Sequence, residues 1–298
     1  MADGRVFLYA DRTRRLPIAD PDDRELTLSC GAALFHLRLG LRYFGWAVQV
    51  DILPDSTDPD LLAVVIPEEA RDPDESDHAL FGAIPRRFTH RGPFLSTPLP
   101  PALKNMLYRL AGQEGGHLTC LSGPEEKGAL ADLVDAGDRY LAADPGYRGE
   151  LAGWVRTNLT HRPDGIPGYA LGLSTPASLV GPLVLRWTRW GKGQGRQDGR
   201  LVREAPALGI LATRHDDPPH WLAAGQALAA VLLRAAEDDV QAAYHSQPIE
   251  VPHLRARLAE AAGVEGHPQL LLRLGYPRNH RMPTPRRPAS LVTEGRAM

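Results

Sequence analysis

The sequence PRRFTHRGPF (85–94) places three arginines and one histidine within six consecutive positions. Proline and glycine bound the stretch, which indicates a turn. Guanidinium groups recognise phosphate through several planar donors, and Thr89 adds a hydroxyl group. The stretch therefore predicts a local anion site. The alternative from the residues alone is a solvated loop that pairs with the acidic segment RDPDESDH (71–78).

The chain as a whole is close to electrically neutral. Its 298 residues carry a formal net charge of -2 and are 43% hydrophobic and 23% charged, which is typical of a globular protein with one large or two modest domains. We therefore expect no nucleic-acid partner and no membrane partner. Cys30 and Cys120 stand far apart, so we expect no disulfide and no metal site. The start lacks a signal-like apolar run, so a cytoplasmic location is expected.

Strand and helix patterns alternate irregularly along the chain. RVFLYA (5–10) and PALGILAT (206–213) predict strands. Asp20 begins a predicted helix, whose apolar residues recur at helical spacing up to Gly45. The segment 219–238 is apolar on most sides and predicts a buried central helix. This irregular order favours the α+β class over a repeated βαβ unit.

Two further stretches are candidates for ligand contacts. TPRRP (284–288) holds Arg286 and Arg287 between two prolines, which keep the backbone extended. This basic segment either closes over the same anion as the first stretch or lies on the surface. HSQPIEVP (245–252) contains two prolines and presents Glu250 after an apolar segment. That loop either offers N–H groups and a carboxylate to a ligand or only connects two helices.

Taken together, these stretches resemble a flavoprotein family. PRRFTHRGPF resembles the Arg-Arg-Ser-x-Arg-x-Phe phosphate motif of the FMN-dependent nitroreductases, with one residue inserted at Phe88. QPIE (247–250) resembles their Pro-Ile-Glu loop, and LLLRLGYPRNHRMPTPRRP (270–288) resembles their last strand and closing arginine segment. Features similar to the Acg-type branch of FMN-binding oxidoreductases are RELTLSCGAALFHLRLGLRYFGW (24–46), DGIP (164–167), WLAAGQALAAVLL (221–233) and TPRRP (284–288).

The resemblance implies an α+β nitroreductase-like fold in which one chain forms an intrachain pseudo-dimer of two related halves. Residues 1–84 would form the first half and residues 85–298 the second, which carries the phosphate motif. Relatives have a loop of the type Ala-Pro-Ser-x-His-Asn-x-Gln-Pro-Trp before the first strand, and this sequence has none. The first half is therefore expected to be truncated. The departure implies an upstream start codon, an open site, or a site completed by a second chain, so the protein would be a monomeric pseudo-dimer or a homodimer.

The resemblance also implies FMN as the cofactor and assigns residues to it. Its phosphate would be bound by the basic stretch and closed over by the tail, while the QPIE loop would flank the isoalloxazine ring. Val251 stands where nitroreductases usually have a glycine. The implied cofactor-binding residues are Arg86, Arg87, Thr89, Arg91, Pro248, Ile249, Glu250, Val251, Arg286 and Arg287.

The function implied by the resemblance is an FMN-dependent oxidoreductase. It would use NAD(P)H for two-electron reduction of a small-molecule electron acceptor, such as a nitroaromatic or quinone-like compound. No side chain is assigned as a catalytic acid or base. The alternative is a non-catalytic, stress-related protein that binds or sequesters flavin under a lid. The expected lid is the glycine-rich region 160–204, with the Trp-rich LVLRWTRWGKG (183–193), and GKGQGRQDG (191–199) is expected to be a mobile loop. A third interpretation is a degenerate scaffold without flavin.

Overall fold

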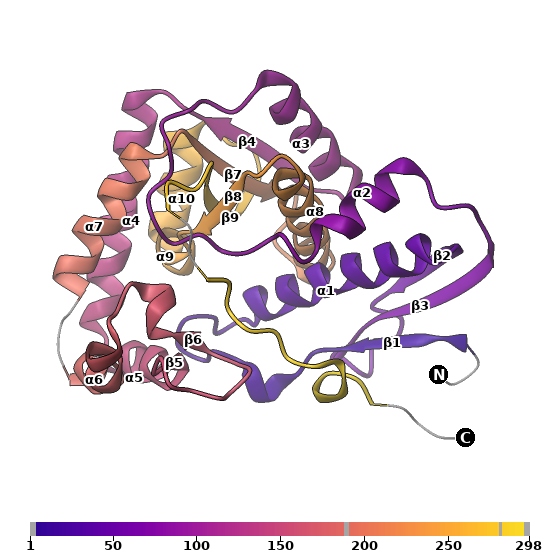
Figure 1. Ribbon diagram of the computed structural model, residues 1–298, viewed down its shortest axis with the longest axis horizontal. Coiled ribbons are helices and arrows are strands. Elements are labelled where there is room, and N and C mark those ends of the chain that lie inside the picture. The colour runs from indigo at the N-terminus through magenta and orange to yellow at the C-terminus, as the bar shows by residue number, and fades with distance from the viewer. Residues whose placement is uncertain (1–3, 188–190, 280–281, 295–298) are drawn as a thin grey trace.

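The fold consists of two antiparallel sheets with helices packed between and around them (Figure 1). The computed structural model describes residues 4–187, 191–279 and 282–294. The first sheet has the order β1-β3-β2 and the second the order β4-β7-β9-β8. The strands are β1 (Val6–Tyr9), β2 (Trp46–Ile52), β3 (Leu61–Ala70), β4 (His117–Leu121), β7 (Ala207–Thr213), β8 (Gln241–Tyr244) and β9 (His267–Gly275), and a short parallel pair joins β5 (Val155–Arg156) to β6 (Ile166–Pro167).

Helices cover the sheets and fill the space between them. The α+β class predicted from the sequence is confirmed, since every strand of the two larger sheets pairs antiparallel with its described neighbours. None of the described helices is both long and apolar enough to cross a bilayer. The helices are α1 (Arg24–Tyr43), α2 (Glu75–Ala83), α3 (Pro101–Gln113), α4 (Pro124–Ala143), α5 (Pro145–Trp154), α6 (Thr175–Trp187), α7 (Gly191–Glu204), α8 (Pro218–Glu237), α9 (Gln247–Glu250) and α10 (Pro252–Ala262), with 3-10 turns at Arg12–Arg14, Gly168–Leu171 and Ala289–Leu291.

The crossing of α1 and α8 brings two helix backbones into direct contact. A Cβ atom added at Gly31 of α1 would overlap the carbonyl oxygen of Leu222, and one added at Gly225 of α8 would overlap the carbonyl oxygen of Leu28. Only glycine leaves room for so close an approach. Most of the α8 side chains are buried, so the prediction of a buried central helix is confirmed.

The two parts of the chain repeat one topology. In β1-α1-β2-β3 and in β7-α8-β8-β9, a strand leads into the long helix, and the last strand lies between the other two. Gly31 and Gly225 each stand at the eighth position of their helix, and the contacts between the helices are reciprocal. Reciprocal contacts of this kind are the mark of two-fold symmetry. The repeat supports the intrachain pseudo-dimer, which stays a prediction together with the halves 1–84 and 85–298.

The glycine-rich region 160–204 is more regular than the sequence indicated. The expectation of a mobile loop at GKGQGRQDG is wrong, because these residues begin α7. Helix α7 packs along α4, where Val202 is fully buried and a Cβ at Gly199 would lie 3.3 Å from the carbonyl oxygen of Ala131. Tertiary contact therefore outweighs the low helix propensity of glycine. Part of the Trp-rich stretch, residues 188–190, lies outside the described residues.

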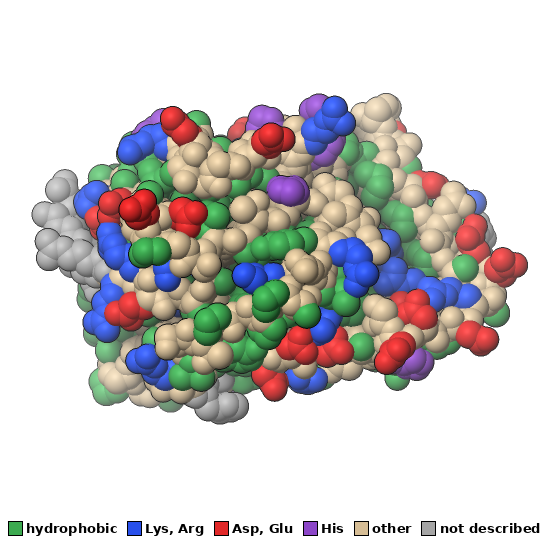
Figure 2. Space-filling model, turned by 90° about the horizontal axis from the view of Figure 1, so that it is seen from above, with side chains coloured by type: hydrophobic (Ala, Val, Ile, Leu, Met, Phe, Trp, Pro, Cys, Tyr) green, Lys and Arg blue, Asp and Glu red, His purple; other side chains and the backbone are tan. Residues whose placement is uncertain are grey.

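Charged side chains of both signs lie on the face of the molecule seen in Figure 2. Figure 2 shows acidic and basic side chains interspersed over one face, with hydrophobic side chains between them. This pattern fits a formal net charge of -2. An anion site must therefore arise where basic side chains converge locally.

The glycine contact between α1 and α8 can be tested by substitution. We expect Gly225→Ala to lower the free energy of unfolding by about 1–3 kcal/mol, because the added methyl group overpacks the crossing. The control is Gly40→Ala in α1, where an added Cβ meets no described heavy atom within 4 Å. This control should raise the free energy of unfolding by about 0.5–1 kcal/mol. Denaturant unfolding measures both, and equal midpoints for the two variants would contradict the backbone contact.

Candidate functional site

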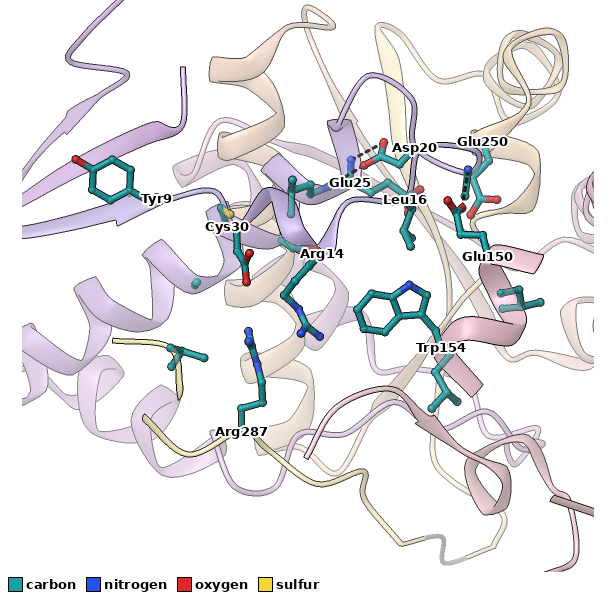
Figure 3. A pocket seen from close by; sticks show the side chains of 18 of the residues that line it. Tyr9, Arg14, Leu16, Asp20, Glu25, Cys30, Glu150, Trp154, Glu250 and Arg287 are labelled. Carbon is teal, nitrogen blue, oxygen red and sulfur yellow. Dashed lines mark hydrogen bonds between the residues drawn. The ribbon is translucent and has the colours of Figure 1, made fainter. Parts of the chain in front are cut away.

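A cavity of about 620 Å³ opens beside α1 and forms the candidate site (Figure 3). Its walls come from α1, the segment that follows β1, α5 and the C-terminal residues 287–292. The C-terminal segment, yellow in Figure 1, leaves the second sheet and crosses toward β1 and α1. Small-molecule sites commonly have volumes of roughly 300–1,000 Å³. The cavity is therefore large enough for a cofactor or substrate.

One end of the cavity is acidic. The carboxylate of Asp20 accepts hydrogen bonds from the backbone N–H groups of Glu25 and Leu26, at 3.0 and 2.9 Å, and so caps the start of α1. Beside it, burial raises the pKa of Glu25 although Arg24 pairs with its carboxylate at 2.8 Å. Burial also raises the pKa of Glu250 well above its usual value, and the nearby charge of Glu25 adds to this effect. The acidic end therefore favours a protonated carboxyl group at Glu250, which can donate a hydrogen bond.

One oxygen atom of the Glu250 carboxyl group lacks a hydrogen-bond partner among the described residues. This atom, Oε2, is buried. Figure 3 shows Glu250 beside Glu150 at the same end of the cavity. Buried polar atoms in folded proteins are normally paired. This atom is therefore a candidate for contact with a bound molecule, and it belongs to the QPIE segment that the sequence singled out.

Helix α9 presents Glu250 because its other residues are fixed in the core. A Cβ at Gly137 of α4 would lie 2.8 Å from the carbonyl carbon of Gln247, so α9 rests directly on α4. Ile249 and Val251 are buried in the core with residues of α4, α10 and β9. The side chain of Val251 therefore packs away from the cavity. Pro248 is buried as well and stands within α9. Of the QPIE loop predictions, the structure places only Glu250 on the cavity wall.

The other end of the cavity is basic. Arg14 and Arg287 both line it, and Figure 3 shows their guanidinium groups pointing toward one another. The guanidinium carbon of Arg14 lies 4.8 Å from the ring centroid of Trp154, which is a cation–π contact. The sequence had marked Arg287 but neither Arg14 nor Trp154. The only sequence signal for Arg14 was the basic run DRTRR (11–15) directly after the first strand.

Three arginines lie near the phenol of Tyr244. The charges of Arg87, Arg91 and Arg286 all act on the phenol of Tyr244, although burial is the larger effect and raises its pKa. Arg286 also donates a hydrogen bond to the backbone oxygen of Arg87, at 3.3 Å. Burial and the neighbouring Arg87 lower the pKa of Arg286. We refer to Arg87, Arg91 and Arg286 as the arginine cluster. The basic stretch and the tail, far apart in sequence, thus lie side by side.

His36 connects the arginine cluster to the cavity. Burial lowers the pKa of His36, and its Nδ1 atom lies 2.7 Å from the carbonyl oxygen of Ala32. The charges of Arg87 and Arg286 act on the same ring. Ala33, one turn earlier on α1, lines the cavity. His36 was not among the residues predicted from the sequence, although helical spacing from the apolar stripe of α1 places it near this face.

Two other residues of the basic stretch have structural contacts. Arg86 donates hydrogen bonds to the carbonyl oxygens of Ala236 and Glu237, at 2.9 and 2.8 Å, and to the carboxylate of Asp239. Arg86 therefore satisfies the carbonyl groups at the C-terminal end of α8. Thr89 lies against β8, where it forms an isolated bridge with Ala242.

A buried arginine holds the basic stretch in place. Arg273 of β9 is 1% exposed and donates a hydrogen bond to the carbonyl oxygen of Gly92, at 3.1 Å. Its Nε atom also donates to Nε2 of His245, at 2.8 Å. Burial, with the charge of Arg273, lowers the pKa of His245 to about 3, so this ring is neutral and can accept the bond. The turn that carries the arginine cluster is thus anchored to the second sheet.

Comparison with known proteins finds relatives that match nearly the whole chain. A relative called "Putative NAD(P)H nitroreductase Rv3131", from Mycobacterium tuberculosis, is 32% identical over 96% of this chain and 82% of its own length. This chain belongs to the nitroreductase family. The resemblance found in the sequence is therefore confirmed. A second relative of the family, "Putative NAD(P)H nitroreductase acg" from the same species, is 27% identical over 99% of this chain and 88% of its own length.

This nitroreductase-family chain was also compared with protein-family models and with solved structures. No protein-family model matches it. Among solved structures, the FMN-dependent nitroreductase NfnB from Mycobacterium smegmatis, in complex with NADPH, is 15% identical with a TM-score of 0.49. That alignment covers 74% of this chain and 99% of the other.

The support of α9 by α4 predicts a pH dependence of stability. Burial, followed by the charge of Asp198, raises the pKa of Asp138 from 3.8 to about 7. The folded state therefore holds a proton at Asp138 that the unfolded state loses, and the stability that this group contributes is lost as the pH rises from about 4 to about 7. Asp138→Asn removes this loss. We expect its melting temperature to exceed that of the wild type by a margin that grows over this range.

Thermal unfolding at a series of pH values measures that margin. Asp132→Asn is a matched control, because it changes an exposed carboxylate of the same helix that pairs with Arg203. A margin for Asp138→Asn that stays constant from pH 4 to pH 8 would contradict the buried proton at Asp138.

Proposed function

We propose that the chain binds FMN, with its phosphate on the arginine cluster and its ring in the cavity, and acts as an NAD(P)H-dependent oxidoreductase. The acceptors that we propose are nitroaromatic or quinone-like compounds. The observation that carries the proposal is the gathering of the arginine cluster near Tyr244. Two of its members, Arg87 and Arg286, also act on His36 of α1, one turn from Ala33 on the cavity wall. Names of relatives in the same family refer to NAD(P)H nitroreductases, which supports the same activity.

The arginine cluster fits a phosphate group. Neither Arg87 nor Arg286 forms an ion pair with any described residue, and Arg286 donates only to backbone oxygens and to the hydroxyl of Thr284. Burial and like charge disfavour the charged form of Arg286, whose pKa is lowered. A dianion between these side chains would relieve both effects. We leave Arg86 out of the proposed phosphate site, because its Nη2 atom binds the carbonyl groups at the end of α8.

The cavity fits a planar ring. When bound, FMN supplies the hydride chemistry that links NAD(P)H to an acceptor. Ser29, Cys30 and Ala33 form the α1 wall, and their small side chains leave room for a flat molecule. From Glu25 to His36 the helix rises about 16 Å. Along this length α1 would hold the ring near Glu250 and the phosphate near His36.

The lining of the cavity favours an enzyme over a protein that sequesters flavin. Ile166 is the one described residue of the expected lid region 160–204 that lines the cavity, and neither α6 nor α7 contributes to its wall. The side of the cavity toward solvent therefore remains available to NAD(P)H and to an acceptor. We also propose that the chain acts as its own pseudo-dimer, since α1 of the first half and Glu250 and Arg287 of the second half line one cavity.

Removing two arginines tests the proposed phosphate site. Each charge-assisted hydrogen bond is worth about 1.5–3 kcal/mol, so Arg87→Ala with Arg91→Ala should weaken FMN binding by about two to four orders of magnitude. Flavin fluorescence titration measures the affinity, and circular dichroism checks the fold. Arg109→Ala on the exposed surface of α3 is the control, and its FMN affinity should match the wild type. Unchanged FMN binding in the double variant would refute the phosphate assignment.

A further inference from the structure

The basic end of the cavity carries more positive charge than its neighbours neutralise. Arg14 lines this end, and its one acidic partner among the described residues is Asp164, which also pairs with Arg156 and Arg162 outside the cavity wall. Its distances to the three guanidinium groups are 3.4, 3.5 and 3.5 Å, and none of these is a short contact. A single carboxylate shared among three cations leaves net positive charge at this place.

Arg287 is a second cation on the cavity wall at this end. It is half-buried, lines the cavity and forms no ion pair or hydrogen bond with any described residue. Figure 3 shows its guanidinium group facing that of Arg14. The carboxylate of Asp11 also lines the cavity, but it accepts hydrogen bonds from Thr13 and pairs with neither arginine. Like charges that face one another across a cavity favour an anion between them.

This basic end is separate from the arginine cluster. Arg286 donates to the backbone of Arg87 and so belongs to the cluster, whereas the next residue, Arg287, lines the cavity. The two arginines of the Pro-Arg-Arg-Pro segment therefore lie at different sites, Arg286 in the arginine cluster and Arg287 on the cavity wall. The phosphate of one FMN molecule occupies only one of them under the proposed function. The second place needs a second anionic group.

We propose that Arg14 and Arg287 form an anion-recognition subsite, which selects electron acceptors that carry a carboxylate or a similar anionic group on a planar aromatic ring. The inference rests on the proposed function, because it assigns the acceptor of that same site. A carboxylate accepts paired hydrogen bonds from guanidinium groups. Trp154 lies against Arg14, holds that side chain in place and presents an aromatic surface beside it. Acceptors with a neutral ring lack the group that these two arginines recognise.

Binding of two matched probes tests the subsite. The probes are 4-nitrobenzoate and its neutral counterpart 4-nitrobenzamide, titrated by calorimetry into the FMN-loaded chain. For the wild type we expect the carboxylate to bind at least about tenfold more tightly than the amide. Arg14→Met and Arg287→Met should each bring this ratio close to one. Arg15→Met is the matched control, because Arg15 is more exposed, lies outside the cavity wall and pairs with Asp23 at 3.9 Å.

Each outcome decides a different claim. Equal affinities of the two probes in the wild type, or a ratio that survives both substitutions, would overturn the subsite. If Arg287→Met strips FMN and leaves the ratio unchanged, Arg287 holds the cofactor and the inference is wrong. A wild-type chain that retains no FMN overturns the proposed function instead. The same titration of the FMN-free chain then still shows whether Arg14 and Arg287 distinguish the carboxylate from the amide.

Discussion

The close contact of α1 and α8 at Gly31 and Gly225 is the constraint on which the rest of the structure depends. Because the two backbones touch, α1 cannot turn about its axis without a clash with α8. The face of α1 that carries Ser29, Ala33 and His36 is thereby directed to the cavity and the arginine cluster. One interhelical contact thus joins the two sheets and also fixes one wall of the candidate site.

Charge is arranged along this wall in a way that suits the proposed chemistry. The acidic end holds Glu250, whose pKa burial raises well above its usual value, and the protonated form that this shift favours can donate to a bound molecule without adding negative charge. At the other end Arg14 and Arg287 provide positive charge, and the arginine cluster lies beyond. A neutral donor and two separate groups of cations are what an anionic cofactor and an anionic substrate require when they share one site.

Sequence patterns predicted the features that depend on residues close together in the chain. Helical spacing predicted α1 and α8, and the density of arginines marked the stretch that carries the cluster. The different positions of the arginine side chains were not predictable from the sequence. Arg86 binds the end of α8 and Arg287 lines the cavity, and both positions depend on tertiary contacts. Helix α7 was not predictable either. Its glycines indicate a loop, and the segment is helical because it packs on α4. Arg14 and Trp154 meet only after folding, so no sequence pattern joined them.

The most direct test of the account is whether the chain retains flavin through its phosphate. The chain is mixed with FMN in one sample and with riboflavin in another, both are desalted, and the visible absorption spectra are recorded. The account predicts a retained flavin band with FMN and its loss with riboflavin, since riboflavin lacks the group that Arg87, Arg91 and Arg286 hold. A colourless protein in both samples would contradict FMN binding. Equal retention of both flavins would contradict the role of the arginine cluster.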